Sequence, residues 1–221
     1  MSRPLVLIGA GEFAQIACEY FEHDSDRDVV AFSVERDYLV QPTLAGRPVV
    51  AFETLEADYP PGEVDVFVAI PASQLNRLRT RLYQELKHRG YRFATYVSTR
   101  AFVWRNAEVG ENSFIFEGNV IQPFVRIGNN CILWSGNHVG HRTVVHDNVF
   151  IASHAVVSGY CEIGAGSFVG VNTTFNDHVK VAPDNVIGSG ALVTRNTEPG
   201  RIYVGSPARA VPDKSSFDVK L

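Results

Sequence analysis

Three histidines lie within the stretch SGNHVGHRTVVH, residues 135–146, among valine, threonine, asparagine and glycine. Imidazole titrates near neutral pH, so one of them could take a proton from an attacking nucleophile. Metal binding is the other chemistry that histidines suggest. His138 and His141 would diverge in an extended chain, however, and no cysteine or carboxylate completes a set of four ligands. The stretch therefore predicts acid–base chemistry and no metal site.

The elements that must hold these histidines follow a six-residue repeat. From Val103 to Val193 every sixth residue is aliphatic, except for Phe175. On a helix, residues spaced six apart would point in different directions around the helix axis and could not share one buried face. No single strand is long enough to hold them all. Short strands that turn every six residues place all anchors in one interior, which predicts a β-solenoid. Small residues follow each anchor four positions later, so we expect the thiols of Cys131 and Cys161 to be buried in its corners.

The first part of the chain has a different pattern. PLVLIGAGEFAQIACEYF predicts a buried strand, a glycine turn at Gly9 and Gly11, and a helix whose first N–H groups suit a phosphate. DVVAFSVE and VDVFVAI predict two further strands, and SQLNRLRTRLYQELKHRG predicts a helix that Gly90 ends. This unit has about half the length of a complete Rossmann domain, so NAD binding is the less favoured interpretation. We predict an α/β Rossmann-like domain over residues 1–95 and an all-β solenoid over residues 96–221.

Composition excludes several classes of partner. A net charge of −4 leaves no electrostatic footprint for nucleic acid. No apolar run is long enough to span a membrane, and the start MSRPLVLIGAGEF lacks the features of a signal peptide. Three widely spaced cysteines indicate neither a disulfide framework nor a zinc cluster. We expect a cytoplasmic protein that does not insert into membranes.

The pattern aliphatic-Gly-x-x-small-x resembles that of the hexapeptide-repeat acyltransferases, whose chains wind a left-handed parallel β-helix with three hexads per coil. A small α/β domain ahead of such a helix resembles the bacterial nucleotide-amino-sugar N-acetyltransferases and sialic acid O-acetyltransferases. The resemblance covers nearly the whole chain. It implies an acetyl-CoA-dependent enzyme that N-acetylates a nucleotide-linked amino sugar for a surface glycan such as O-antigen or lipopolysaccharide. It also implies a homotrimer with active sites between subunits.

The resemblance implies roles for individual residues. VGHRTVV aligns with the family motif acid-His-acid-Cys, which makes His141 the expected general base for direct attack of the sugar amine on the thioester. Gly140 and Arg142 replace the flanking acids, so either another group orients the ring or the base is weaker. The N–H of Gly159, one coil later, is expected to stabilise the oxyanion. The expected nucleotide-sugar contacts are Gly11, Glu12, Phe13, Val34, Glu35 and Pro71, and the expected acetyl-CoA contacts are His154, Val171, Ser189 and Arg209.

Several alternatives stay open. The acceptor could be a sugar hydroxyl, as in sialic acid O-acetylation, or the chain could be a non-catalytic trimeric scaffold in which the histidines merely pack. His138 and His146 stand next to anchors, so exposure to solvent or subunit packing explains them better than catalysis. Arg142 could contact a substrate phosphate or be an ordinary surface charge.

Overall fold

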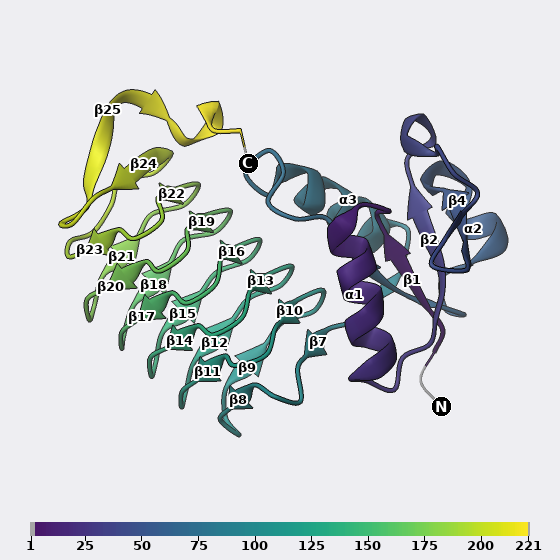
Figure 1. Cartoon of the computed structure of the whole chain (residues 1–221), viewed down its shortest axis with the longest axis horizontal. Coiled ribbons are helices and arrows are strands. Elements are labelled where there is room, and N and C mark those ends of the chain that lie inside the picture. Colours follow the sequence, from purple (N-terminus) through teal and green to yellow (C-terminus); the bar gives the residue numbers. More distant parts are fainter. Residues whose placement is uncertain (1–2, 221) are drawn as a thin grey trace.

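The structure, a computed structural model, describes residues 3–220 and contains an α/β unit that lies beside the first coils of a long β-helix (Figure 1). The α/β unit has one sheet with the strand order β3-β4-β2-β1-β5-β6, parallel except for the β3–β4 pair. Its strands are β1 (Leu5–Ile8), β2 (Val29–Val34), β3 (Thr43–Leu44), β4 (Arg47–Ala51), β5 (Asp65–Val68) and β6 (Arg92–Phe93). Its helices are α1 (Glu12–His23), α2 (Leu55–Asp58) and α3 (Arg77–His88), with short 3-10 turns η1 (Arg36–Tyr38) and η2 (Phe52–Thr54). No helix in the described part of the chain is long and apolar enough to cross a bilayer.

The three predicted strands and two predicted helices are present, and the unit also contains α2 and β6, which were not predicted. The connector between the second and third predicted strands contains β3 and β4, which the sequence did not indicate, and β4 pairs in parallel with β2. Helix α3 begins at Arg77 and not at Ser73, because Gln74, Leu75 and Asn76 have positive φ angles of 54°, 52° and 63°. Residues in that left-handed region cannot extend a right-handed helix.

The second part is a parallel β-helix with three hexads per coil, as the repeat predicted. Over residues 96–193 each strand has two residues and pairs with the strand one coil away, so that Phe114 lies opposite Ile132 and partners differ by 18 positions. The three faces differ in their outward side chains, and we name them accordingly. The domain-side face holds β7 (Tyr96–Val97), β10 (Phe114–Ile115), β13 (Ile132–Leu133), β16 (Phe150–Ile151), β19 (Phe168–Val169) and β22 (Val186–Ile187), and continues into β24 (Arg201–Val204) and β25 (Arg209–Ser215).

The other two faces have the same construction. The apolar face holds β8 (Phe102–Val103), β11 (Val120–Ile121), β14 (His138–Val139), β17 (Val156–Val157), β20 (Thr174–Phe175) and β23 (Leu192–Val193). The charged face holds β9 (Glu108–Val109), β12 (Arg126–Ile127), β15 (Val144–Val145), β18 (Glu162–Ile163) and β21 (Lys180–Val181). The second residue of each two-residue strand points into the shared interior, where an aliphatic side chain contributes roughly 1.5–3 kcal/mol before entropy is counted. Cys131 and Cys161 are buried at the corners, as expected, and the chain ends in η3 (Ser216–Asp218).

The α/β unit is fixed to the domain-side face by an aromatic core and by one buried arginine. Phe13 on α1 packs edge-on against Phe114, with ring centroids 5.7 Å apart. The guanidinium of Arg79 on α3 is fully buried and donates to the carbonyl oxygens of Pro71, at 3.0 Å, and Asn130, at 3.2 Å. Burial lowers the pKa of Arg79 to about 10, so the group remains charged at neutral pH while it joins the two parts.

Asp24, which follows α1, forms a second junction with the first coil of the β-helix. Its carboxylate accepts hydrogen bonds from the hydroxyls of Thr99, Tyr96 and Ser98 and from the backbone N–H of Thr99. These hydrogen bonds, led by that of the Thr99 hydroxyl, lower the pKa of Asp24 from 3.8 to about 2. The ionised form is therefore the one that stabilises the junction.

We predict that Asp24→Asn removes a pH-dependent part of the stability. A carboxylate with a depressed folded-state pKa contributes stability above its unfolded-state pKa and loses that contribution as pH falls from about 4 towards 2. Because the group is partly exposed, its contribution near neutral pH should be about 1 kcal/mol. Urea unfolding of both proteins between pH 7 and pH 2.5 measures it. The separation between the curves should narrow steadily as the pH falls below about 4, and a constant separation at every pH would contradict the assignment.

Candidate active site

His141 lies at the corner between the apolar face and the charged face, where β14 ends and β15 has not begun. Its imidazole is exposed, with Nδ1 3.3 Å from Oε1 of Gln122 in the preceding coil. The same oxygen accepts the backbone N–H of His141 at 2.9 Å. The ring of Tyr160 meets the imidazole edge-on, with centroids 5.1 Å apart. A histidine held in this way presents its other ring nitrogen, Nε2, as the available base.

Gly159 lies one coil beyond His141 at the same corner. A Cβ on Gly159 would lie 2.6 Å from Cε1 of His141, so the glycine leaves the space that the imidazole occupies. Its N–H donates to the carboxylate of Asp177 at 2.9 Å. The expected oxyanion role of that N–H does not fit this arrangement, because its proton is already used by the following coil. Gly159 contributes room for the ring instead.

The residues expected to contact acetyl-CoA lie at two different corners. His154, Val171 and Ser189 follow β16, β19 and β22, so they stand at the corner between the domain-side face and the apolar face. His141 stands at the opposite edge of the apolar face. Within one chain, therefore, the fold does not bring His154 to His141.

Arg209 lies in the hairpin that closes the β-helix. It lines a small cavity of about 150 Å³ together with Arg195, which belongs to the same corner as His141. Arg195 stands three coils beyond His141, a distance of about 14 Å at the usual spacing of neighbouring strands. Its pairing with Arg209 follows from the chain turning back at Gly205, which no repeat pattern reveals.

The α/β unit contains an apolar cavity of about 290 Å³. Its wall includes the glycine turn at Gly9 and Gly11 and the end of β2 at Val34 and Glu35, so three of the six expected nucleotide-sugar contacts meet there. Gly9 has φ 124°, and a Cβ on it would lie 2.8 Å from the carbonyl oxygen of Ala69, so the turn requires glycine. The hydroxyl of Ser33 is buried on the same wall and has no hydrogen-bond partner among residues 3–220. Such an orphaned polar group is typical of a ligand or water site.

The other three expected contacts are placed differently. The side chain of Phe13 is only 5% exposed and packs into the aromatic core, so only its backbone N–H remains for a ligand at the start of α1. Glu12 is exposed beside it. Pro71 is not part of the cavity wall, and its carbonyl is bonded to Arg79. The wall includes instead Tyr38 and Val40, which follow β2 and are exposed at 68% and 88%.

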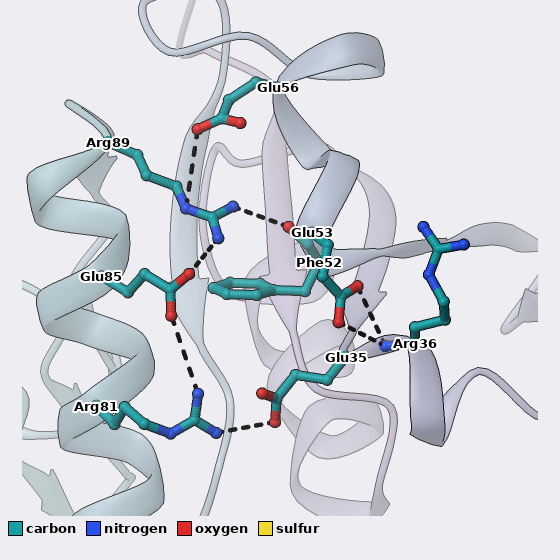
Figure 2. Close-up of polar contacts among 8 residues, drawn as sticks. All are labelled: Glu35, Arg36, Phe52, Glu53, Glu56, Arg81, Glu85 and Arg89. Carbon is teal, nitrogen blue, oxygen red and sulfur yellow. Dashed lines mark hydrogen bonds and ion pairs between the residues drawn. The ribbon is translucent and has the colours of Figure 1, made fainter.

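A network of charged residues holds Glu35 at the rim of this cavity (Figure 2). The carboxylate of Glu35 pairs with Arg81 of α3 at 2.9 Å, and Arg81 also faces Glu85 at 3.9 Å. Glu85 in turn pairs with Arg89, whose guanidinium stacks over the ring of Phe52 at 4.4 Å. Arg81, Glu85 and Arg89 are spaced four residues apart, and this spacing in the sequence indicates ion pairs along one side of α3. The network gives the rim a carboxylate with a fixed position.

The rest of the described chain supplies no metal centre. No group of three or more histidine, cysteine, aspartate or glutamate side chains in residues 3–220 is arranged to hold a metal ion. The chemistry available at these sites is that of imidazole, backbone amides and paired arginines.

Part of the β-helix matches a family model. The family model described as bacterial transferase hexapeptide (six repeats) matches residues 106–141. The resemblance to the hexapeptide-repeat sugar acetyltransferases is confirmed, and the fold is their α/β unit followed by a left-handed parallel β-helix. A search of curated proteins finds no match to the chain.

Solved structures match nearly the whole chain. One is the H141N mutant of perosamine N-acetyltransferase from Caulobacter crescentus, in complex with CoA and GDP-perosamine, at 25% identity over 95% of this chain and 97% of that chain, with a TM-score of 0.86. Another is the acetyltransferase domain of PglB from Neisseria gonorrhoeae FA1090, at 23% identity over 95% of this chain and 100% of that chain, with a TM-score of 0.83. WeeI from Acinetobacter baumannii AYE matches at 23% identity over 95% and 100% of the two chains, with a TM-score of 0.74.

We predict that Gly159→Ala displaces the His141 ring without unfolding the chain. The added Cβ would approach the end of a flexible side chain, which can move, and Gly159 does not need a positive φ. Catalysis that depends on His141 should fall by about 10- to 100-fold, because a displacement of about 1 Å is enough for such a loss. NMR of histidine labelled with ¹⁵N should show shifted His141 signals at an unchanged melting temperature. Gly11→Ala, where a Cβ would meet nothing within 4 Å, should leave those signals in place.

Proposed function

We propose that this chain is an acetyl-CoA-dependent N-acetyltransferase whose acceptor is the amine of a nucleotide-linked amino sugar. The observation that carries the proposal is the match, over nearly the full length of both chains, to a structure that holds CoA and GDP-perosamine. That relative was solved with one of its histidines replaced by asparagine and also with the histidine replaced by alanine. Acetyl-CoA and nucleotide sugars are made in the cytoplasm, so we place the enzyme there. Its product would be a building block for a surface glycan.

The proposed reaction is a direct transfer. The amine nitrogen attacks the thioester carbonyl carbon, Nε2 of His141 takes the proton that the amine loses, and the C–S bond then breaks to release CoA as its thiolate. That proton can pass from the imidazolium to the departing sulfur. Burial raises the pKa of the Cys131 thiol to about 12 and also raises that of Cys161, so neither thiol is a suitable nucleophile for an acyl-enzyme. No covalent intermediate is needed.

The three faces of the β-helix support an active site shared between subunits. The domain-side face is covered by the chain's own α/β unit. The charged face presents ion pairs, such as Lys180 with Glu162 at 2.8 Å, which suit solvent. The apolar face presents a column that includes Phe102, 53% exposed, and Val156, 40% exposed. The outward residues of this face are Phe102, Val120, His138, Val156, Thr174 and Leu192, and four of these six are apolar, which is typical of a surface that another subunit covers.

A threefold arrangement then completes the site. When three copies turn their apolar faces towards a common axis, the corner that carries His141 in one copy meets the corner that carries His154, Val171 and Ser189 in the next. In the neighbouring copy, the corner that carries His154 also borders the domain-side face. The α/β unit of that copy, with its proposed nucleotide cavity, therefore lies on the same side as His141. We therefore propose a homotrimer with three sites, each built from two chains.

The corner that carries His141 also offers a path for the acyl donor. Arg195 and Arg209 lie about 14 Å along this corner from the proposed base. Coenzyme A carries its phosphates at the far end of a long chain from its thioester, so two cations at such a distance suit its anionic end. The paired arginines support acetyl-CoA as the donor.

We predict that His141→Asn lowers kcat at least about 100-fold, the usual contribution of a general base, and leaves CoA affinity unchanged. Release of free CoA from acetyl-CoA, followed with a panel of nucleotide-linked amino sugars, measures turnover. The same panel with hydroxyl sugars in place of amino sugars separates N-acetylation from O-acetylation. Full activity in His141→Asn would place the base elsewhere. A wild-type chain that neither binds CoA nor turns over any acceptor would favour the scaffold interpretation.

We predict that Val156→Lys on the apolar face separates the trimer. A lysine charge in the middle of a buried subunit contact would lose its hydration, whereas Val144→Lys at the equivalent position on the charged face should be tolerated. Light scattering after size-exclusion chromatography should report one chain mass for Val156→Lys and three for Val144→Lys and wild type. Acetyl transfer should fall with the trimer, because each site needs two chains. A monomeric wild type, or an active monomer of Val156→Lys, would contradict the shared site.

A further inference from the structure

Neither chain neighbour of His141 can orient its ring. A Cβ at Gly140 would lie 2.5 Å from the carbonyl carbon of Ser158 and 2.6 Å from the backbone nitrogen of Gly159, which are parts of the next coil. An acidic side chain is therefore excluded at position 140. Arg142 has φ 59° and stacks its guanidinium over the ring of Phe124 at 4.4 Å. The group that positions the base must come from another coil.

Gln122 reaches His141 from the preceding coil. Its Oε1 accepts the backbone N–H of His141 at 2.9 Å and lies 3.3 Å from Nδ1 of the ring. A backbone N–H can only donate, so the amide of Gln122 must turn its oxygen, and not its nitrogen, towards His141. An oxygen without a proton can only accept, so the ring nitrogen that faces it must carry a hydrogen. The backbone contact thus favours the Nδ1–H tautomer, with the lone pair on Nε2.

We propose that Gln122 is the positioning residue of this enzyme: it fixes the ring orientation and the Nδ1–H tautomer of His141, so that Nε2 is free to accept the proton. The inference rests on the proposed role of His141 as base. Gln122 holds the ring from the coil on one side, and Gly159 leaves room for it from the coil on the other side. An amide oxygen has no net charge, so Gln122 orients the imidazole without adding a negative charge that would favour imidazolium.

Other ionisable groups also face this corner. Tyr160 meets the imidazole edge-on, His178 stacks on Tyr160 with centroids 4.9 Å apart, and Asp177 is bonded to the Gly159 N–H. Arg142 is next in the chain and lies over Phe124. A substitution at position 122 leaves all of these groups in place, so a change in the pH profile can be assigned to the contact with Gln122.

Two variants of Gln122 separate positioning from simple packing. Gln122→Met has nearly the same shape but no acceptor, and it should lower kcat by about 10- to 100-fold with little change in KM for either substrate. Gln122→Glu restores an acceptor and should recover most of that loss. Its negative charge favours imidazolium, so the acid limb of its kcat/KM profile should move upwards by about one pH unit. Equal activity in Gln122→Met and wild type would overturn the inference, as would equal losses with unshifted profiles in both variants.

An independent measurement tests the tautomer without any substrate. The ¹⁵N shifts and long-range couplings of His141, assigned by comparison with His141→Asn, distinguish Nδ1–H from Nε2–H. The Nδ1–H form should predominate in wild type and lose that predominance in Gln122→Met. An Nε2–H form in wild type would overturn the inference even if the enzyme is active. A wild type that transfers no acetyl group but shows the Gln122-dependent Nδ1–H form would refute the proposed function and leave the positioning contact established.

Discussion

The parallel pairing of each coil with the next is the constraint on which the rest of the molecule depends. Because partners differ by 18 positions, a residue and its successor one coil later occupy the same corner. Side chains far apart in the sequence thus form straight columns along the β-helix. His141, Gly159, Asp177 and Arg195 form one such column. The proposed base, the space for its ring and a donor-side cation are all placed by the backbone ladder.

Another column shows how the ladder joins the two parts of the chain. Asn112 donates to the side-chain oxygen of Asn130 at 2.6 Å, and Asn130 donates to that of Asn148 at 2.7 Å. At the end of the column, Oδ1 of Asn112 accepts a hydrogen bond from the backbone N–H of Val68 in β5 at 2.8 Å. The buried guanidinium of Arg79 donates to the carbonyl of Asn130 beside it. Buried polar groups are satisfied in series, so these hydrogen bonds join the α/β unit and its cavity to the β-helix.

Sequence periodicity was enough to predict the β-helix, since the anchors from Val103 to Val193 allow only a chain that turns every six residues. It could not predict β4, because the connector that contains it has no alternating pattern. Arithmetic with 18-residue coils could have placed Asp177 beside Gly159, and it places Gln122 opposite Gly140, the residue before His141. It could not have told which hydrogen bonds form, because side-chain direction at a corner depends on the local φ angles. Ser33 was readable as a polar residue in the otherwise apolar strand VVAFSV, but its lack of a partner needed coordinates.

The exposed position of His141 in one chain has a physical consequence for the proposed site. An amide–imidazole hydrogen bond at a solvated surface competes with water and contributes little to holding the ring. When a neighbouring corner covers it, water is excluded and the same bond becomes stronger in the lower dielectric. The contact with Gln122 would then hold the ring most firmly when two chains meet and substrate can bind. In this arrangement the assembly of two chains also aligns the His141 ring, and no mobile lid is needed.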